Sequence, residues 1–216
     1  MAKTTRWDDG YWLLLMQLYL RKPVGVKPIY SRKMVELALE LHIEPKVLYA
    51  QMLRLRRLDT PRIERLWNTY SHNPQKLRKG VQMLRKMKGF NNAEEFYDGV
   101  DVHTTFERDF LPIQGYPALT PLMLTLILDL YFRLTPNTMV TDTPEVAQLA
   151  KKMKVTPRTV VEALHAFQVC DPYLRQREVT DDNLQEACND IWQRYGNDNP
   201  DQLVATASMM MDYFKK

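Results

Sequence analysis

The sequence predicts an all-α protein built from two similar modules. Glycine is scarce, at 7 of 216 residues, and the apolar residues recur mostly at helical spacing. One pattern also occurs twice: residues 31–61 indicate two short helices joined by a tight turn, and residues 143–172 repeat them at a shift of 112. We therefore expect two pseudo-repeated modules of about five helices each, and each module contains a helix-turn-helix-like pair.

The first helix should begin at Asp8 or Asp9, because either side chain can cap it. It should end by Lys22, because Pro23 disfavours the α conformation in the residue before it. Its apolar stripe is wide, which predicts burial on more than one side. The stripe consists of Tyr11, Trp12, Leu13, Leu14, Leu15, Met16, Leu18, Tyr19 and Leu20.

The helix-turn-helix-like pair follows. Ser31 is a suitable N-cap for its first helix, and Pro45 opens its second helix at the N1 position that proline tolerates. The turn between them, residues 42–44, has no glycine. The positions expected to face the core are Met34, Leu37, Ala38, Leu41, Val47, Leu48, Met52, Leu55 and Leu58.

Two more helices complete the first module. One starts after Pro61 and is broken at residues 72–74, and the other runs from about Pro74 to Lys88 with Gly89 as its C-cap. The last helix should turn one face inward and a strongly basic face outward. The inward set is Leu77, Val81, Leu84 and Met87, and the outward set is Lys76, Arg78, Lys79, Arg85, Lys86 and Lys88.

Residues 91–118 break the helical rhythm and are rich in aromatic side chains, which a flexible linker would lack. We interpret them as an ordered connector packed onto both halves, with one possible helical turn at residues 94–97. The domain boundaries that follow are residues 1–90, 91–118 and 119–216.

The second module matches the first without a gap from Asp8 to Asp59. Pro157 corresponds to Pro45, and Asp171 corresponds to Asp59. The second copy then has a longer loop, so Trp192 matches Trp67 at a shift of 125 and Pro200 matches Pro74 at a shift of 126. Agreement of caps, prolines, aromatics and core positions predicts a true internal repeat.

The net charge of +4 hides an asymmetry between the halves. Residues 1–90 hold 19 Lys and Arg against 7 Asp and Glu, a net +12, and residues 91–216 hold 11 against 19, a net −8. Such a difference suggests that one half binds a polyanion or that the halves attract each other, and plain charge drift between solvated surfaces is the alternative. The chain has no apolar run of membrane-spanning length and no signal-peptide pattern, and its two cysteines lack metal-ligand spacing, so we expect a cytoplasmic protein with reduced thiols.

A helix-turn-helix places its second helix in the major groove of DNA. In the first copy this helix and the start of the preceding one offer cations that can clamp phosphates or read guanine edges, and a tyrosine that can stack. The candidate nucleic-acid-binding residues are Arg32, Lys33, Lys46, Tyr49, Arg54, Arg56 and Arg57. The simpler interpretation, a solvated helix end whose cations complement the helix dipole, accounts for only one or two of the arginines.

The second copy lacks this basic face. Ala166, Gln168 and Val169 stand at the positions of Arg54, Arg56 and Arg57, and Val161 replaces Tyr49. We therefore expect residues 119–216 to pack against the first module or against a partner protein.

Catalytic signals are weak. The four histidines are scattered; His165 is expected to be a half-buried surface residue, and His103 lies in the connector beside Asp101 and Glu107. No glycine-rich phosphate loop, HExxH or CxxC motif occurs. We therefore predict no enzymatic activity, no cofactor and no metal.

Two segments resemble a known pattern. Residues 51–59 (QMLRLRRLD) and 163–172 (ALHAFQVCDP) are similar to the K-L-x-N-F-x-x-L-D-P segment of the helical region that precedes the nuclease domain in some bacterial HNH endonucleases. Arg54 and Ala166 replace its asparagine, and no HNH catalytic motif follows. The resemblance implies two such helical modules without the nuclease, a DNA-associated role, and no catalytic residue.

The sequence thus predicts a non-enzymatic DNA-binding protein that contacts DNA through residues 1–90. The alternative is a helical protein-interaction scaffold that binds no nucleic acid. Whether the arginines point to solvent or pair with carboxylates separates the two hypotheses.

Overall fold

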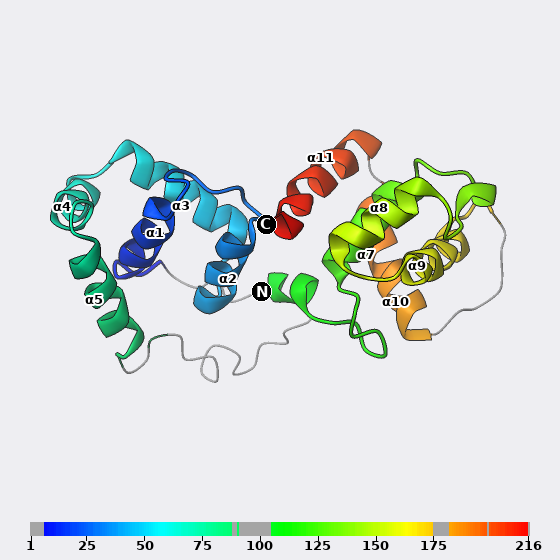
Figure 1. Ribbon diagram of the computed structural model, residues 1–216, viewed down its shortest axis with the longest axis horizontal. Coiled ribbons are helices and arrows are strands. Elements are labelled where there is room, and N and C mark those ends of the chain that lie inside the picture. The colour runs from blue at the N-terminus through cyan, green and yellow to red at the C-terminus, as the bar shows by residue number, and fades with distance from the viewer. Residues whose placement is uncertain (1–6, 88–89, 91–104, 175–181, 198, 216) are drawn as a thin grey trace. The chain divides into compact units, whose positions relative to one another are not determined.

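The computed structural model describes residues 7–87, 90, 105–174, 182–197 and 199–215 (Figure 1). Within these ranges the chain forms helices and no β-strand, which confirms the all-α prediction. It divides into two compact units, Met1–Thr105 and Phe106–Lys216. None of the described helices is both long and apolar enough to cross a lipid bilayer.

The first unit is arranged around its first helix. Helix α1 (Tyr11–Leu20) contacts each of the other helices of the unit. These are α2 (Arg32–Leu41), α3 (Pro45–Arg57), α4 (Pro61–Tyr70) and α5 (Pro74–Arg85). Figure 1 shows α1 between α2 on one side and α4 and α5 on the other. Leu15 and Met16 are fully buried in α1, as its wide apolar stripe predicts.

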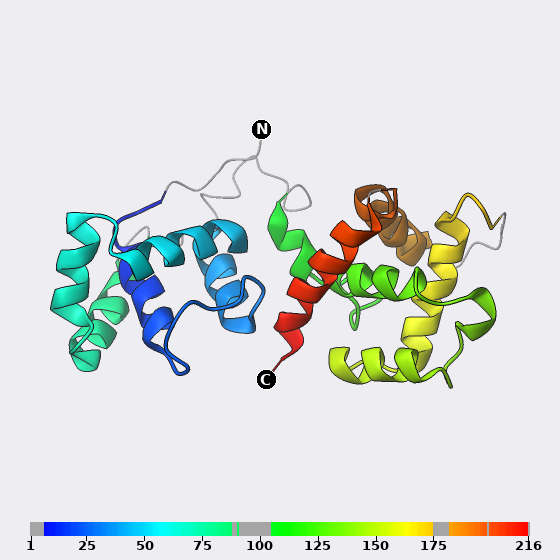
Figure 2. The ribbon, with the colours of Figure 1, turned by 90° about the horizontal axis from the view of Figure 1, so that it is seen from above.

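The second unit has the same kind of centre. Helix α7 (Pro121–Tyr131) is buried along almost its whole length and contacts α8, α9, α10 and α11. The surrounding α-helices are α8 (Pro144–Met153), α9 (Pro157–Cys170), α10 (Asp182–Ile191) and α11 (Pro200–Met210). Shorter segments are the 3-10 helices η2 (Phe106–Phe110), η3 (Pro136–Thr138) and η5 (Met211–Phe214) and the π-helix η4 (Trp192–Gly196). Figure 2 shows α11 alongside α7.

The turns after α2 and α8 have one geometry. His42 and Lys154 both take the left-handed conformation, with φ of 53° and 63°. In each turn the next amide donates back into the helix: Ile43 N to Ala38 O and Val155 N to Ala150 O, both at 3.0 Å. This bond satisfies a carbonyl that the helix end would leave free, which offsets the cost of a left-handed residue other than glycine.

Several details differ from the sequence-based expectations. The boundary between the units lies after Thr105, so residues 106–118 of the expected connector belong to the second unit, where Ile113 is buried. Ser31 and Thr143 occupy the N-cap positions of α2 and α8, but neither side chain accepts a capping bond. Gly89 and the turn expected at residues 94–97 lie outside the described residues.

Two apolar residues of the first unit are also on the outside. Val47 is 41% exposed and Met87 is 63% exposed, although the helical spacing predicts both to face the core. Val47 lies in the first turn of α3, and Met87 lies beyond the last residue of α5. Both positions are at helix ends, where neighbouring helices no longer cover the apolar face of the helix.

The central position of α7 gives a stability prediction. Ile127→Ala should lower the free energy of unfolding by about 2–5 kcal/mol, because Ile127 is fully buried and its truncation leaves a cavity. The measurement is denaturant unfolding followed by circular dichroism. Val204→Ala, at a position 53% exposed on α11, is the control and should change stability by less than about 0.5 kcal/mol. Equal effects of the two changes would contradict the central role of α7.

Candidate nucleic-acid interface

Helix α3 has a buried face and an exposed cationic face. Leu48, Met52 and Leu55 are buried against α1 and α2. Lys46, Arg56 and Arg57 are exposed, and Tyr49 is partly exposed. Residues 46, 49, 53, 56 and 57 follow helical spacing, so these side chains share one side of α3.

Arg54 has a different role from the other candidates. Its Nε donates to Asp59 Oδ2 at 3.0 Å and its Nη1 donates to Gln51 Oε1 at 3.1 Å. Its guanidinium carbon also lies 5.8 Å from the centroid of the Trp12 ring, in cation–π contact. Arg54 therefore links α3 to α1 and to the turn after α3, and much of its bonding capacity is used inside the unit.

Arg32 and Lys33 lie in the first turn of α2, on a different helix from the rest of the set. Both are exposed. Lys33 Nζ is 2.6 Å from Glu36 Oε2, one turn along the same helix. The structure thus brings Lys46, Tyr49, Arg56 and Arg57 together on one helix and places Arg32 and Lys33 apart from them.

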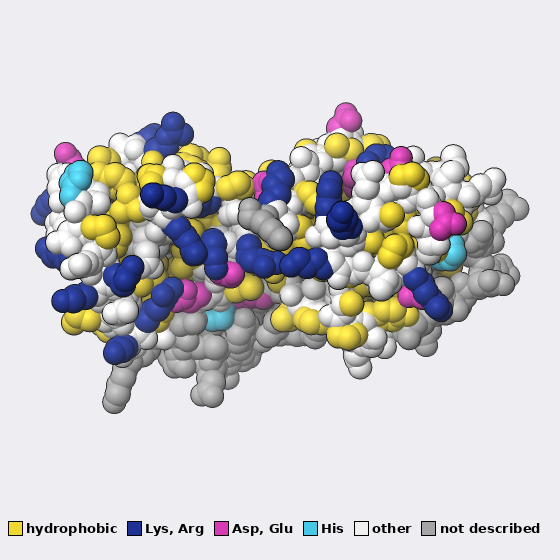
Figure 3. All heavy atoms as spheres, viewed as in Figure 1, with side chains coloured by type: hydrophobic (Ala, Val, Ile, Leu, Met, Phe, Trp, Pro, Cys, Tyr) yellow, Lys and Arg dark blue, Asp and Glu magenta, His cyan; other side chains and the backbone are white. Residues whose placement is uncertain are grey.

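The first unit has many cations without a carboxylate partner. Its described ion pairs join Lys33 to Glu36, Arg54 to Asp59, Arg62 to Asp9 and Arg85 to Glu40. In the part of the unit that the structure describes, a further set of cations forms no ion pair: Arg21, Lys22, Lys46, Arg56, Arg57, Arg65, Arg78, Lys79 and Lys86. Lys and Arg side chains are spread over the visible face of this unit in Figure 3. Charge counting indicated this excess, but only the structure shows which cations have no carboxylate partner among the described residues.

A groove of about 660 Å³ lies between α2 and α5, over α1. Leu14, Leu18 and Leu77 contribute apolar lining. Arg85 and Glu40 join its two walls by a bidentate pair, with Nε to Oε1 at 2.5 Å and Nη2 to Oε2 at 2.8 Å. The remaining charged lining residues are Arg21, Lys33, Glu36 and Arg78. The sequence did not predict this groove, because its walls come from helices that are distant in the chain. Arg85 of α5 and Glu40 of α2, which pair across it, are 45 residues apart.

In the second unit, two residues at the positions of Arg54 and Arg56 are buried within the unit itself. Ala166 and Gln168 of α9 are 0% and 5% exposed, and α10 packs along α9. Gln185 Nε2 of α10 donates to Ala166 O at 3.2 Å, and Gln168 Nε2 lies 3.1 Å from Met139 Sδ. The apolar substitutions at these positions are therefore explained by packing inside the unit. That residues 119–216 pack against the first module or a partner protein stays a prediction.

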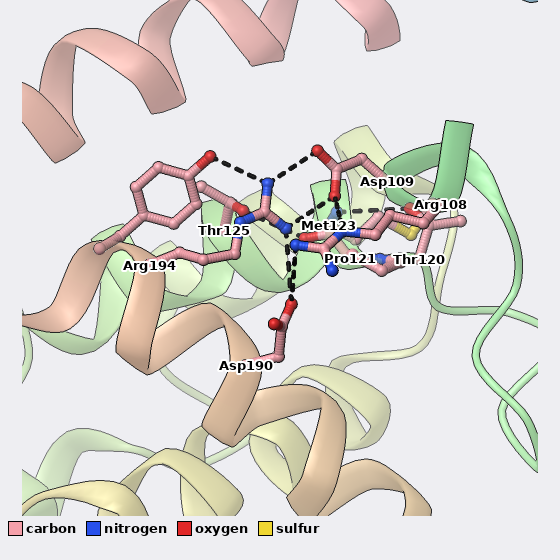
Figure 4. A network of polar contacts seen from close by, with 9 residues as sticks. Arg108, Asp109, Thr120, Pro121, Met123, Thr125, Asp190 and Arg194 are labelled. Atoms are coloured by element: carbon pink, nitrogen blue, oxygen red, sulfur yellow. Dashed lines mark hydrogen bonds and ion pairs between the residues drawn. The ribbon is translucent and has the colours of Figure 1, made fainter. Parts of the chain in front are cut away.

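A polar network joins the start of the second unit to its π-helix (Figure 4). Arg194 donates to both carboxylate oxygens of Asp109, with Nη1 to Oδ1 at 2.7 Å and Nη2 to Oδ2 at 2.9 Å. Arg108 and Asp190 complete the network, with Arg108 Nη2 3.5 Å from Asp190 Oδ2. Burial alone would lower the pKa of Arg194, but the bonds to Asp109 raise it. Every carboxylate here has an arginine partner, which is typical of a structural clamp.

The groups considered for catalysis are separate from one another or lie in ordinary structural settings. His165 is exposed on α9, not half-buried as expected, and His103 lies outside the described residues. Burial raises the pKa of the Cys170 thiol to about 11 and also raises that of Cys188. Among the described residues no three His, Cys, Asp or Glu side chains are grouped to hold a metal ion. No family model, curated protein or solved structure matches the chain.

The raised thiol pKa gives a reactivity prediction. A nucleophilic cysteine needs a lowered pKa, and a pKa of about 11 leaves Cys170 almost fully protonated at pH 8. A disulfide reagent at pH 8 should therefore modify Cys170 of the folded protein at least about tenfold more slowly than in denaturant, where the pKa returns to about 8.5. The site of modification is read by mass spectrometry. Equal rates in the two states would show that Cys170 is an accessible thiolate.

Proposed function

We propose that the protein binds DNA through the exposed cations of its first unit. The observation that carries this proposal is the set of cations on and around α3 that have no carboxylate partner among the described residues. Lys46, Arg56 and Arg57 lie on one side of one helix. Cations that a protein does not neutralise internally are available to phosphates, whose neutralisation releases counterions from DNA.

We also infer that the chain is a duplicated helix-turn-helix protein. Helix α8 begins and ends 112 residues after α2, and α9 begins 112 residues after α3. The left-handed residues His42 and Lys154 are also 112 apart. In each unit a tyrosine of the central helix meets a tryptophan edge-on: Tyr19 and Trp67 at 5.7 Å and 79°, and Tyr131 and Trp192 at 5.8 Å and 76°. These agreements in local geometry support common ancestry of the two units.

The geometry of α3 suggests a division of labour. Arg56 and Arg57 close the helix and are well placed to neutralise phosphates, which sets affinity more than sequence preference. Lys46 and Tyr49 lie nearer its beginning, the part of a recognition helix that approaches base edges. Arg54 supports this helix from behind through Asp59 and Trp12.

The proposal predicts a strong dependence on salt. Arg56→Ala combined with Arg57→Ala should weaken binding to duplex DNA about tenfold or more near 0.1 M salt. It should also make the negative slope of log K against log salt shallower by about 2, since each phosphate contact contributes about −0.9 to that slope. The measurement is a fluorescence anisotropy titration at several salt concentrations.

A matched control removes two cations that already have partners in the unit. Arg62 pairs with Asp9, and Lys76 lies over the Tyr70 ring at 5.3 Å. Arg62→Ala with Lys76→Ala should change the affinity less than about threefold, because phosphate contacts carry the salt-dependent term. If wild-type protein does not bind DNA at low salt, or if the two double variants behave alike, the proposal fails.

The second candidate function is a protein-interaction scaffold, and the groove between α2 and α5 favours it. Its apolar floor suits the apolar face of a helix. Arg21, Lys33, Arg78 and Arg85 outnumber Glu36 and Glu40 among the lining residues, so the fitting partner is an acidic helical peptide. If such a peptide binds in the groove, it should not displace bound DNA, because Arg56 and Arg57 do not line the groove.

A further inference from the structure

The second unit also carries a cationic surface, on the turn between α8 and α9. Lys151, Lys152, Lys154 and Arg158 lie within eight residues of chain, with no acidic residue among them. All four are exposed, and the Arg158 side chain is 85% exposed. We name residues 151–158 the turn surface.

Ion pairing separates the turn surface from the rest of its unit. Outside it, every Lys and Arg that the structure describes in this unit has a carboxylate partner: Arg108 and Arg194 pair with Asp109, Arg133 with Asp129, and Lys215 with Asp212. Arg158 pairs with Glu162 one turn along α9, at 3.0 Å. Lys151, Lys152 and Lys154 have no ion pair among the described residues. In an acidic half of the chain, three neighbouring unneutralised lysines indicate a polyanionic ligand.

The helix that follows these lysines has a polar exposed face. Arg158, Glu162 and His165 are spaced i, i+4 and i+7, so they form one strip on α9. Arg158 and His165 are exposed and Glu162 is partly exposed. The opposite side of α9 is buried, at Val160, Leu164 and Phe167. The exposed strip therefore begins beside the lysines.

The two units thus place their cations differently on matching helices. In the first unit the strip at residues 46, 50 and 53 reads Lys, Ala and Leu, and the arginines come at the end of α3. In the second unit the equivalent strip is Arg, Glu and His, and the lysines come before α9 begins. The equivalents of Arg54, Arg56, Arg57 and Tyr49 all lie after residue 158, so their loss of charge does not reveal the second cationic surface.

We propose that the turn surface is a second DNA-binding site, with Lys151, Lys152 and Lys154 on phosphates and Arg158 and His165 toward base edges. This inference rests on the proposed function of the first unit and extends it to two linked contacts on one duplex. Lysine acts as a point charge on phosphates, and arginine with its planar fork suits guanine edges. Two linked sites that bind one duplex at the same time raise the overall affinity above that of either site.

The test compares two double variants of the full chain with the same loss of charge. Lys151→Gln with Lys152→Gln should make the negative slope of log K against log salt shallower by about 2 and weaken binding to a long duplex about tenfold or more. The control, Arg133→Gln with Lys215→Gln, removes two cations of the same unit that have carboxylate partners, with side chains 58% and 71% exposed. It should change the affinity less than about threefold. Circular dichroism checks that both variants fold.

A second readout uses the length of the DNA. Wild-type protein should bind a duplex of about 30 base pairs more tightly than one of about 10, since a bivalent contact gains from length. The Lys151→Gln, Lys152→Gln variant should lose this gain and keep its affinity for the short duplex.

The outcomes distinguish the two proposals. If this lysine variant binds like wild type while Arg56→Ala with Arg57→Ala weakens binding, the turn surface is not a DNA site and the first-unit proposal stands. If only the lysine variant weakens binding, the turn surface is confirmed and α3 is not the main contact. If wild-type protein binds no duplex at low salt, both proposals are overturned.

Discussion

Each unit depends on one helix that its neighbours enclose. Helices α1 and α7 are apolar on almost every side, so neither is stable in water until other helices cover it. In the first unit α2, α3, α4 and α5 all contact α1, and in the second unit α8, α9, α10 and α11 all contact α7. The outer helices need only one apolar face each. Their other faces are therefore free to carry charge, and that freedom is what both binding proposals use.

An aspartate that follows the second helix of the pair, α3 or α9, has a different partner in each unit. In the first unit Asp59 accepts a bond from Arg54 at 3.0 Å. In the second unit alanine stands at the matching position 166, and Asp171 instead accepts a bond from the Tyr131 hydroxyl at 2.7 Å. Burial and this bond together raise the pKa of Tyr131. The carboxylate is thus paired in both units, by arginine in one and by tyrosine in the other.

The charge asymmetry of the sequence means that the two units differ in how many of their cations have a carboxylate partner. The first unit has too few carboxylates to pair its cations, so many of them remain available to an external anion. The second unit has enough carboxylates to pair most of its cations, as in the clamp of Arg194 on Asp109. The three unpaired lysines of the turn surface are notable because they occur in this acidic setting. Net charge alone hides them, since it sums over paired and unpaired groups alike.

The sequence by itself determined the all-α class and most helix positions. Prolines at the first helical position and the spacing of core leucines are local signals, and local signals survive in the fold. Tertiary structure alone decided which faces stay exposed. Helix α10 covers Ala166, Met139 contacts Gln168, Arg54 lies against the Trp12 ring, and Val47 stays outside. These outcomes depend on which distant helix packs on which face, and spacing along a single helix contains no information about that partner.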